Sequence, residues 1–157
     1  MEDLTRSQLY TNDLIKRKPS AMAWIIGNQS NPMLNGLAVF YSLSSGGVLI
    51  SVEIYGLPDN GDSKFFGMHI HEFGNCTLPF DKTGNHYNPT NSSHPNHAGD
   101  LPPILSGNGY GWIAFYDKRF NLSEIIGKSI IIHNMSDDFK SQPAGNSGLK
   151  IGCGVIK

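Results

Sequence analysis

The sequence has little charge, few cysteines and no long apolar run. Charged residues make up 16% of the 157 residues, the formal net charge is −1, and two residues are cysteines. Without a basic excess there is no field to attract phosphate groups, so we expect no nucleic-acid partner. No apolar stretch approaches the roughly 18 residues that a membrane-spanning helix requires, so we expect no membrane partner either.

The sequence as written also shows no secretory signal. Residues 1–20, MEDLTRSQLYTNDLIKRKPS, mix charges throughout and hold no apolar core of the kind such signals carry. The chain as written is therefore predicted to be cytoplasmic, and it would be exported if a signal segment had been removed. The two cysteines, Cys76 and Cys153, fit either two buried free thiols or one disulfide.

Helical periodicity is nearly absent, and strand-like patterns replace it. Only residues 3–17 and 121–128 could hold a helical turn or two. Segments rich in β-branched and aromatic residues, separated by turn residues, span 21–28, 35–43, 47–57, 67–74, 111–117, 129–134 and 151–156. Short strands joined by turns predict a single domain of the all-β class, either a sandwich or a barrel.

Five of the six histidines fall within residues 69–97, where a polar loop follows a predicted strand. Long loops that are rich in Gly and Pro are usually functional or disordered, and the clustered histidines favour function here. In the strand, His69 and His71 are two positions apart, so both side chains leave the same face of the sheet. His133 stands at the end of another predicted strand, a rigid position for a further ligand.

The polar loop itself holds a second group of candidate metal ligands. His94, His97 and Asp100 follow one another at spacings of three, and His86 precedes them. Imidazole nitrogen suits both copper and zinc, and an added carboxylate favours zinc. We therefore predict two metals of different character, one held from strands and open to substrate, the other closed and structural.

Five ordered motifs resemble the copper–zinc superoxide dismutases, and the loop composition is closer to the bacterial-type branch of that family. They are GMHIHEFGNC, GNHYNP, HPNHAGDLP, IIIHNMSDDF and GNSGLKIGCGVI. The resemblance runs over residues 21–157 and leaves residues 1–20 as an N-terminal arm outside the match. It implies a flattened eight-stranded Greek-key β-barrel. Copper–zinc superoxide dismutases are counted among the proteins with a sandwich architecture.

The resemblance also implies a role for every histidine. The implied copper ligands are His69, His71, His86 and His133. The implied zinc ligands are His86, His94, His97 and Asp100. Asp137 matches the aspartate that links a copper ligand to a zinc ligand, here His69 to His94. Cys76 and Cys153 match the family's disulfide within one subunit.

The implied activity is the conversion of superoxide to O₂ and H₂O₂ by alternate reduction and reoxidation of copper, with zinc in a structural role. His86 would bridge the two metals and carry a proton during the cycle. A cation beside the copper would attract the anionic substrate. Here the chain departs from the best-known members, because Lys150 replaces their arginine and loses its planar fork of donors. Lys140 is a weaker second candidate for the same role.

The sequence also allows two functions other than the enzyme. One is a non-catalytic relative that binds metal or delivers copper, which we would expect to have lost ligands. The other is a zinc-only structural protein. The family resemblance also allows a homodimer as partner.

Overall fold

Antiparallel strands form the framework of the described chain. The computed structural model describes residues 4–59, 61 and 63–157. Its strands are β1 (Ala21–Gly27), β2 (Asn35–Ser42), β3 (Val48–Tyr55), β4 (Phe65–Phe66), β5 (Met68–His71), β6 (Ile104–Leu105), β7 (Gly111–Asp117), β8 (Ser129–His133) and β9 (Lys150–Val155). Its helices are α1 (Arg6–Lys16), α2 (Leu122–Ile125) and the single 3₁₀ turn η1 (Asp81–Thr83).

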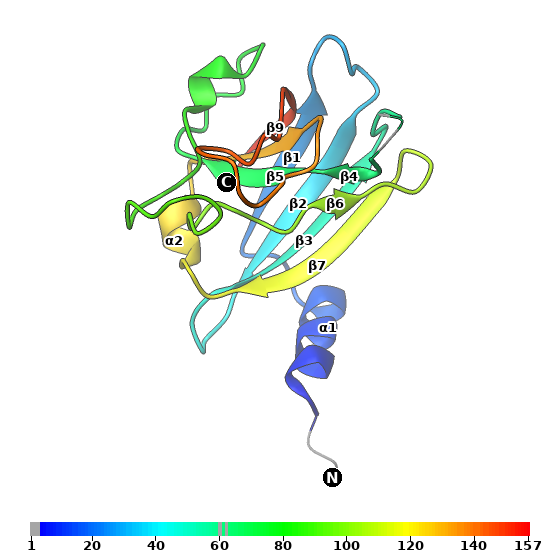
Figure 1. Ribbon diagram of the computed structural model, residues 1–157. Coiled ribbons are helices and arrows are strands. Elements are labelled where there is room, and N and C mark those ends of the chain that lie inside the picture. The colour runs from blue at the N-terminus through cyan, green and yellow to red at the C-terminus, as the bar shows by residue number, and fades with distance from the viewer. Residues whose placement is uncertain (1–3, 60, 62) are drawn as a thin grey trace.

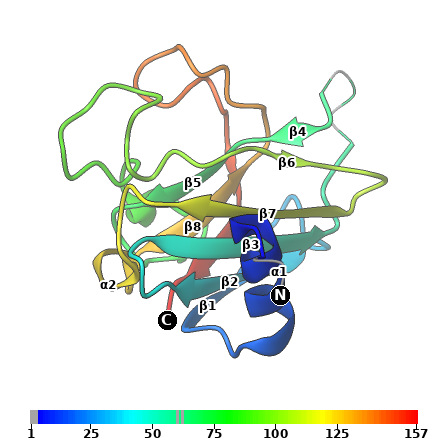
Figure 2. The ribbon, with the colours of Figure 1, turned by 90° about the horizontal axis from the view of Figure 1, so that it is seen from below.

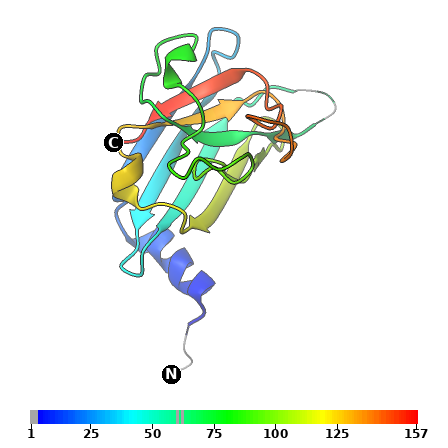
Figure 3. The same ribbon diagram turned by 60° about the vertical axis from the view of Figure 1, so that its left-hand side comes forward.

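Seven strands form one curled sheet in the order β5-β8-β9-β1-β2-β3-β7 (Figure 1). β1, β2 and β3 follow one another as a meander, and β8 pairs with β9. Crossovers of the Greek-key kind lead from β3 to β5, from β5 to β7 and from β7 to β8. The sheet curls so that β5, β8 and β9 lie over β1, β2, β3 and β7 (Figures 2 and 3). β4 and β6 pair only with each other as a two-stranded ribbon.

The core lies between these two halves of the sheet. Along β1, Ala21, Ala23 and Ile25 are buried, and the residues between them are exposed. From the other half, Met68 and Ile70 of β5 enter the same apolar cluster. Because side chains alternate along a strand, His69 and His71 of β5 must lie on the opposite face from this core. The sheet therefore separates its packed interior from its histidine-bearing surface.

The predicted all-β barrel class is confirmed, and each of the seven predicted strands belongs to the curled sheet. The strand count differs from the implied eight, because the structure also assigns β4 and β6. These two strands contain two residues each, which is too short for period-2 alternation to reveal in the sequence.

Helix α1 carries the N-terminal segment to the lower end of the sheet (Figure 3). A capping box begins it, in which Thr5 accepts from the Gln8 N–H and the Gln8 side chain accepts from the Thr5 N–H. The Tyr10 ring lies 5.3 Å from the Tyr116 ring of β7. Within the described part of the chain, no helix is long and apolar enough to cross a bilayer. That residues 1–20 form an arm on a domain of 21–157 stays our proposal, and residues 1–3 lie outside the described residues.

A disulfide joins Cys76 to Cys153, which confirms the implied pairing. Cys153 lies in β9, where it packs with Phe80 and Ile131 in a small apolar cluster outside the main core. The bond ties the start of the loop that follows β5 to the last strand. It therefore holds down one end of the segment that carries most of the histidines.

We expect loss of this disulfide to destabilise the protein strongly. The two cysteines are 77 positions apart. Closing a loop of that length in the unfolded chain is worth about 4–5 kcal/mol in the chain-entropy model. The double variant Cys76→Ala/Cys153→Ala should lose free energy of unfolding of that order in urea denaturation monitored by circular dichroism. A loss below about 1 kcal/mol would contradict a stabilising role for the bond.

Candidate metal centre

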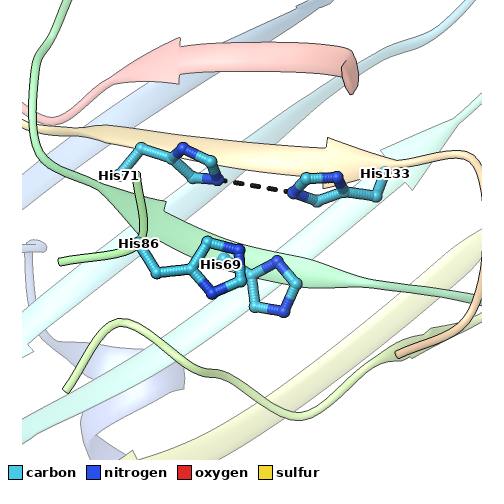
Figure 4. A group of neighbouring side chains, drawn as sticks. All are labelled: His69, His71, His86 and His133. Carbon is cyan, nitrogen blue, oxygen red and sulfur yellow. Dashed lines mark hydrogen bonds between the residues drawn. The ribbon is translucent and has the colours of Figure 1, made fainter. Parts of the chain in front are cut away.

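The first histidine cluster lies on the outer face of the β5–β8 pair. His69 and His71 come from β5, and His133 is the last residue of β8. His86 reaches the cluster from the loop after η1. This loop pairs with β5 through a bridge between His86 and His71. Figure 4 shows the His71 and His133 rings directed toward each other and the His86 ring lying against His69. One nitrogen from each of the four rings lies within 4.8 Å of the others, and all four residues are buried.

The second cluster shares His86 with the first. Its other members are His94, His97 and Asp100, and its four ligand atoms also lie within 4.8 Å of one another. Asp100 stands at the centre: its Oδ1 lies 2.7 Å from His86 Nδ1 and 3.3 Å from His97 Nδ1. Its Oδ2 lies 3.1 Å from His94 Nδ1. The structure thus brings together every histidine and the aspartate that the sequence singled out.

Hydrogen bonds on the far side of the rings determine which nitrogens carry protons in the first cluster. His71 Nδ1 lies 2.9 Å from the Gly84 carbonyl and His133 Nδ1 lies 3.3 Å from the Gly148 carbonyl. A carbonyl only accepts, so both Nδ1 atoms donate and both Nε2 atoms hold lone pairs. These two Nε2 atoms are 3.4 Å apart, where two acceptors cannot bond each other.

Asp137 orders the His69 and His94 rings in the same way. Its carboxylate accepts from His69 Nε2 at 2.7 Å and from His94 Nε2 at 2.9 Å. Among the described residues, His69 Nδ1, His86 Nε2 and His94 Nδ1 are buried side-chain atoms without a hydrogen-bond partner. Buried lone pairs that face one another are costly unless a cation lies between them. The donor set of each cluster therefore fits a metal ion.

Burial lowers the pKa of His69, His71 and His133 and so favours their neutral form. It lowers the pKa of His133 to about 3, with the nearby His69 acting in the same direction. Burial likewise lowers the pKa of His71, followed by the effect of His133. Burial raises the pKa of Asp137, but hydrogen bonds from His69, the Phe139 N–H and His94 outweigh it and bring that pKa to about 2. His71 and His133 are thus neutral and Asp137 is ionised, the protonation states that metal binding requires.

A cavity of about 640 Å³ opens onto the first cluster. Its lining includes His71, His86 and His133 of the first cluster, and His86 and His97 of the second. Glu72, Gln142 and Lys150 also line it. His94 and Asp100 do not line it and are buried behind it. A small molecule can therefore reach three of the four residues of the first cluster, whereas it can reach only His86 and His97 of the second.

Lys150 lies at the wall of this cavity as the first residue of β9. Its Nζ donates to Thr83 Oγ1 at 2.9 Å and to the Gly84 carbonyl at 3.1 Å. The same carbonyl accepts from His71 Nδ1, so Lys150 and a ring of the first cluster are held by one acceptor. Lys140, the second sequence candidate, is exposed and does not line the cavity.

Sequence reasoning missed Gln142. Its side-chain amide accepts from the His94 N–H at 3.0 Å and donates to the His94 carbonyl at 2.7 Å. It thereby joins the loop after β8 to the loop that holds His94. No sequence pattern marks it, because in a polar segment a glutamine that binds another loop cannot be told from one that faces solvent.

Comparison with known proteins decides the family. A family model described as Copper/zinc superoxide dismutase (SODC) matches residues 34–156. The chain belongs to the copper/zinc superoxide dismutase family. Copper–zinc superoxide dismutase 3 of Arabidopsis thaliana is 37% identical over 87% of this chain and 88% of its own length. Copper–zinc superoxide dismutase 1 of Aquifex aeolicus is 37% identical over 73% of this chain and 75% of its own length.

One solved structure shares the fold, and one relative in sequence is named as a chaperone. The crystal structure of the clock protein EA4 superposes with a TM-score of 0.75 at 31% identity, covering 88% of this chain and 94% of that one. A copper chaperone for superoxide dismutase from Mus musculus is 31% identical over 78% of this chain and 48% of its own length. The donor chemistry of the two clusters matches the two metals in the family's name.

The buried neutral rings predict that the metal-free protein loses stability as the pH falls. A histidine in the unfolded chain takes up its proton near pH 6.5, whereas folded His133 does so only near 3. Between these values the unfolded state binds more protons, so acid favours unfolding. Well below pH 6.5 the loss is roughly 1.4 kcal/mol per pH unit for each such ring. Urea denaturation between pH 7.5 and 5 measures it, and His133→Asn should flatten the slope. A metal-free protein equally stable at both pH values would contradict neutral burial.

Proposed function

We propose that this protein is a superoxide dismutase, in which two superoxide anions and two protons yield one O₂ and one H₂O₂. The observation that supports this best is the pair of buried clusters that share His86, with a cavity lined by three members of the first cluster and by only His86 and His97 of the second. A redox centre must be reached by substrate, whereas a structural metal is better closed.

Copper would be held by His69, His71, His86 and His133, and it supplies one-electron redox chemistry when bound. The protein's own residues orient the ring nitrogens and supply protons. His71 and His133 have their Nδ1–H groups occupied by backbone carbonyls, so they can present only Nε2. His86 differs, because its Nε2 faces the first cluster with no other partner while its Nδ1 lies against Asp100. We infer that His86 holds and releases the reaction's proton at Nε2.

Zinc would be held by His86, His94, His97 and Asp100, where it offsets the charge of Asp100 and stiffens the loop. Asp137 links the two sites, because one of its oxygens binds the His69 ring and the other binds the His94 ring. Hydrogen-bond partners of this kind orient ligand rings and set their basicity. A change in the position of either ring therefore acts on the other ring through Asp137.

Lys150 would attract superoxide to the cavity. It retains the positive charge of the family's arginine, and two of its three N–H groups are occupied by Thr83 and Gly84. The third is free of those partners, so Lys150 offers one donor and a point charge where arginine would offer a fork.

The presence of a copper-chaperone relative makes copper delivery the alternative function. We favour the enzyme because neither cluster lacks a ligand and the cavity leads to the first of them. Homodimer formation stays a prediction, which sedimentation velocity can test.

Metal content and activity together test the proposed enzyme. Protein that holds one copper and one zinc per chain should remove superoxide in a cytochrome c competition assay. His71→Ala should abolish that activity and keep zinc, because His71 lies outside the second cluster. Inactivity of the fully loaded protein would refute the enzyme, and loss of zinc from His71→Ala would refute the division of ligands.

Reversing the charge of Lys150 should slow the enzyme. We expect Lys150→Glu to lower the second-order rate constant by about 10-fold or more at low ionic strength, since steering raises encounter rates by 10–10³. Lys140→Glu is the matched control, because it makes the same charge change at an exposed position outside the cavity. Pulse radiolysis across a range of salt concentrations measures both. Equal slowing of the two variants would show that only net charge matters.

A further inference from the structure

Arg119 joins the end of β7 to the loop that carries the second cluster. Its Nη1 donates to the His97 carbonyl at 3.0 Å, and its Nη2 donates to the Asp100 carbonyl. Both carbonyls belong to residues whose side chains are members of that cluster. One guanidinium therefore holds the backbone of two ligands that are three positions apart.

Asp117 fixes the direction in which this guanidinium points. It is the buried last residue of β7 and pairs with Val48 in the sheet. Its Oδ1 accepts from Arg119 Nε at 3.0 Å and from the Arg119 N–H at 2.8 Å, and its Oδ2 accepts from Nη2 at 2.6 Å. Asp117 thus fixes the guanidinium relative to β7, and the guanidinium fixes the loop relative to β7.

The local structure of the loop cannot provide this alignment alone. His97 and Asp100 form a tight turn, in which the Asp100 N–H donates to the His97 carbonyl at 3.1 Å and the His97 N–H donates to Asp100 Oδ2 at 3.0 Å. This turn sets the two residues relative to each other and leaves their placement against His86 to outside contacts. Backbone hydrogen bonds hold the middle of the turn, because the Gly99 N–H donates to the Tyr87 carbonyl and the Gly99 carbonyl accepts from the Ile70 N–H. Arg119 binds the carbonyls at the two ends of the turn.

We propose that Arg119 is a positioning residue for the zinc site, through its fork rather than its charge. The inference rests on the proposed assignment of zinc to His86, His94, His97 and Asp100. Charge and geometry predict opposite effects here. A nearby positive charge repels Zn²⁺, so its removal alone would tighten binding. Loss of the fork would loosen the turn and weaken binding.

Zinc affinity of the full-length protein separates the two effects. Affinity is measured by competition with a chromophoric chelator for wild type, Arg119→Met and Arg119→Lys. We expect Arg119→Met to lower the affinity about 10- to 100-fold, the usual effect of losing a group that orients ligands. Arg119→Lys keeps the charge, and we expect it to recover only part of the loss because one ammonium cannot reproduce the fork.

Cobalt provides a readout that does not depend on affinity or activity. With Co²⁺ in the zinc site, the visible d–d bands report ligand geometry. We expect these bands to shift in both Arg119 variants. Arg17→Met is the matched control, because Arg17 also binds an aspartate, Asp13, and a backbone carbonyl, that of Ser42, and neither residue belongs to a cluster. It should leave zinc affinity and the cobalt spectrum unchanged.

Three results would overturn the positioning role: unchanged or tighter zinc binding in Arg119→Met, full recovery in Arg119→Lys, or an equal change in Arg17→Met. If Arg119→Met fails to fold, Arg119→Lys and Asp117→Asn decide the question, and wild-type affinity with an unshifted cobalt spectrum in both would refute it. A wild-type protein that binds no zinc would instead refute the proposed zinc assignment.

Discussion

The metal centre depends on where the buried imidazole protons are held. His71, His133, His69 and His94 each use one nitrogen to donate outward, to a backbone carbonyl or to Asp137. Their other nitrogens are then left as lone pairs that face inward, toward one another or toward Asp100. In an apolar interior this arrangement is unfavourable by itself and becomes favourable when a cation occupies the centre. The outer acceptors therefore prepare the site for metal.

The barrel makes this arrangement possible by separating packing from chemistry. Period-2 alternation along β5 sends Met68 and Ile70 into the core and His69 and His71 to the other face. β8 does the same, with Ile130 and Ile132 in the core and His133 at its end. The ligands thus stand on rigid strands, and the core need not tolerate polar groups. The remaining ligands come from a loop, which requires anchors from outside.

Three anchors hold the loop that carries His86, His94, His97 and Asp100. The disulfide holds its beginning to β9, Gln142 binds the His94 backbone, and Arg119 binds the turn at His97 and Asp100. Each anchor is a polar or covalent contact to a different element, so the loop gains rigidity without an apolar core of its own. On the substrate side, Gly84 accepts from both His71 and Lys150, which couples the proposed guide for superoxide to the ligand geometry.

The sequence alone determined the fold class, the seven strands of the main sheet and the family, because period-2 patterns and ordered motifs are local properties of a chain. It also predicted which residues would gather at the clusters, since the spacing of His69 and His71 and the His94–Asp100 turn are local too. Only the tertiary structure decided what fixes the rings. The pairing of Asp137 with two distant histidines was implied by resemblance, but the carbonyls of Gly84 and Gly148, the amide of Gln142 and the fork of Arg119 carry no sequence signal. Their roles arise from contacts between residues far apart in the chain, and composition and spacing do not encode such contacts.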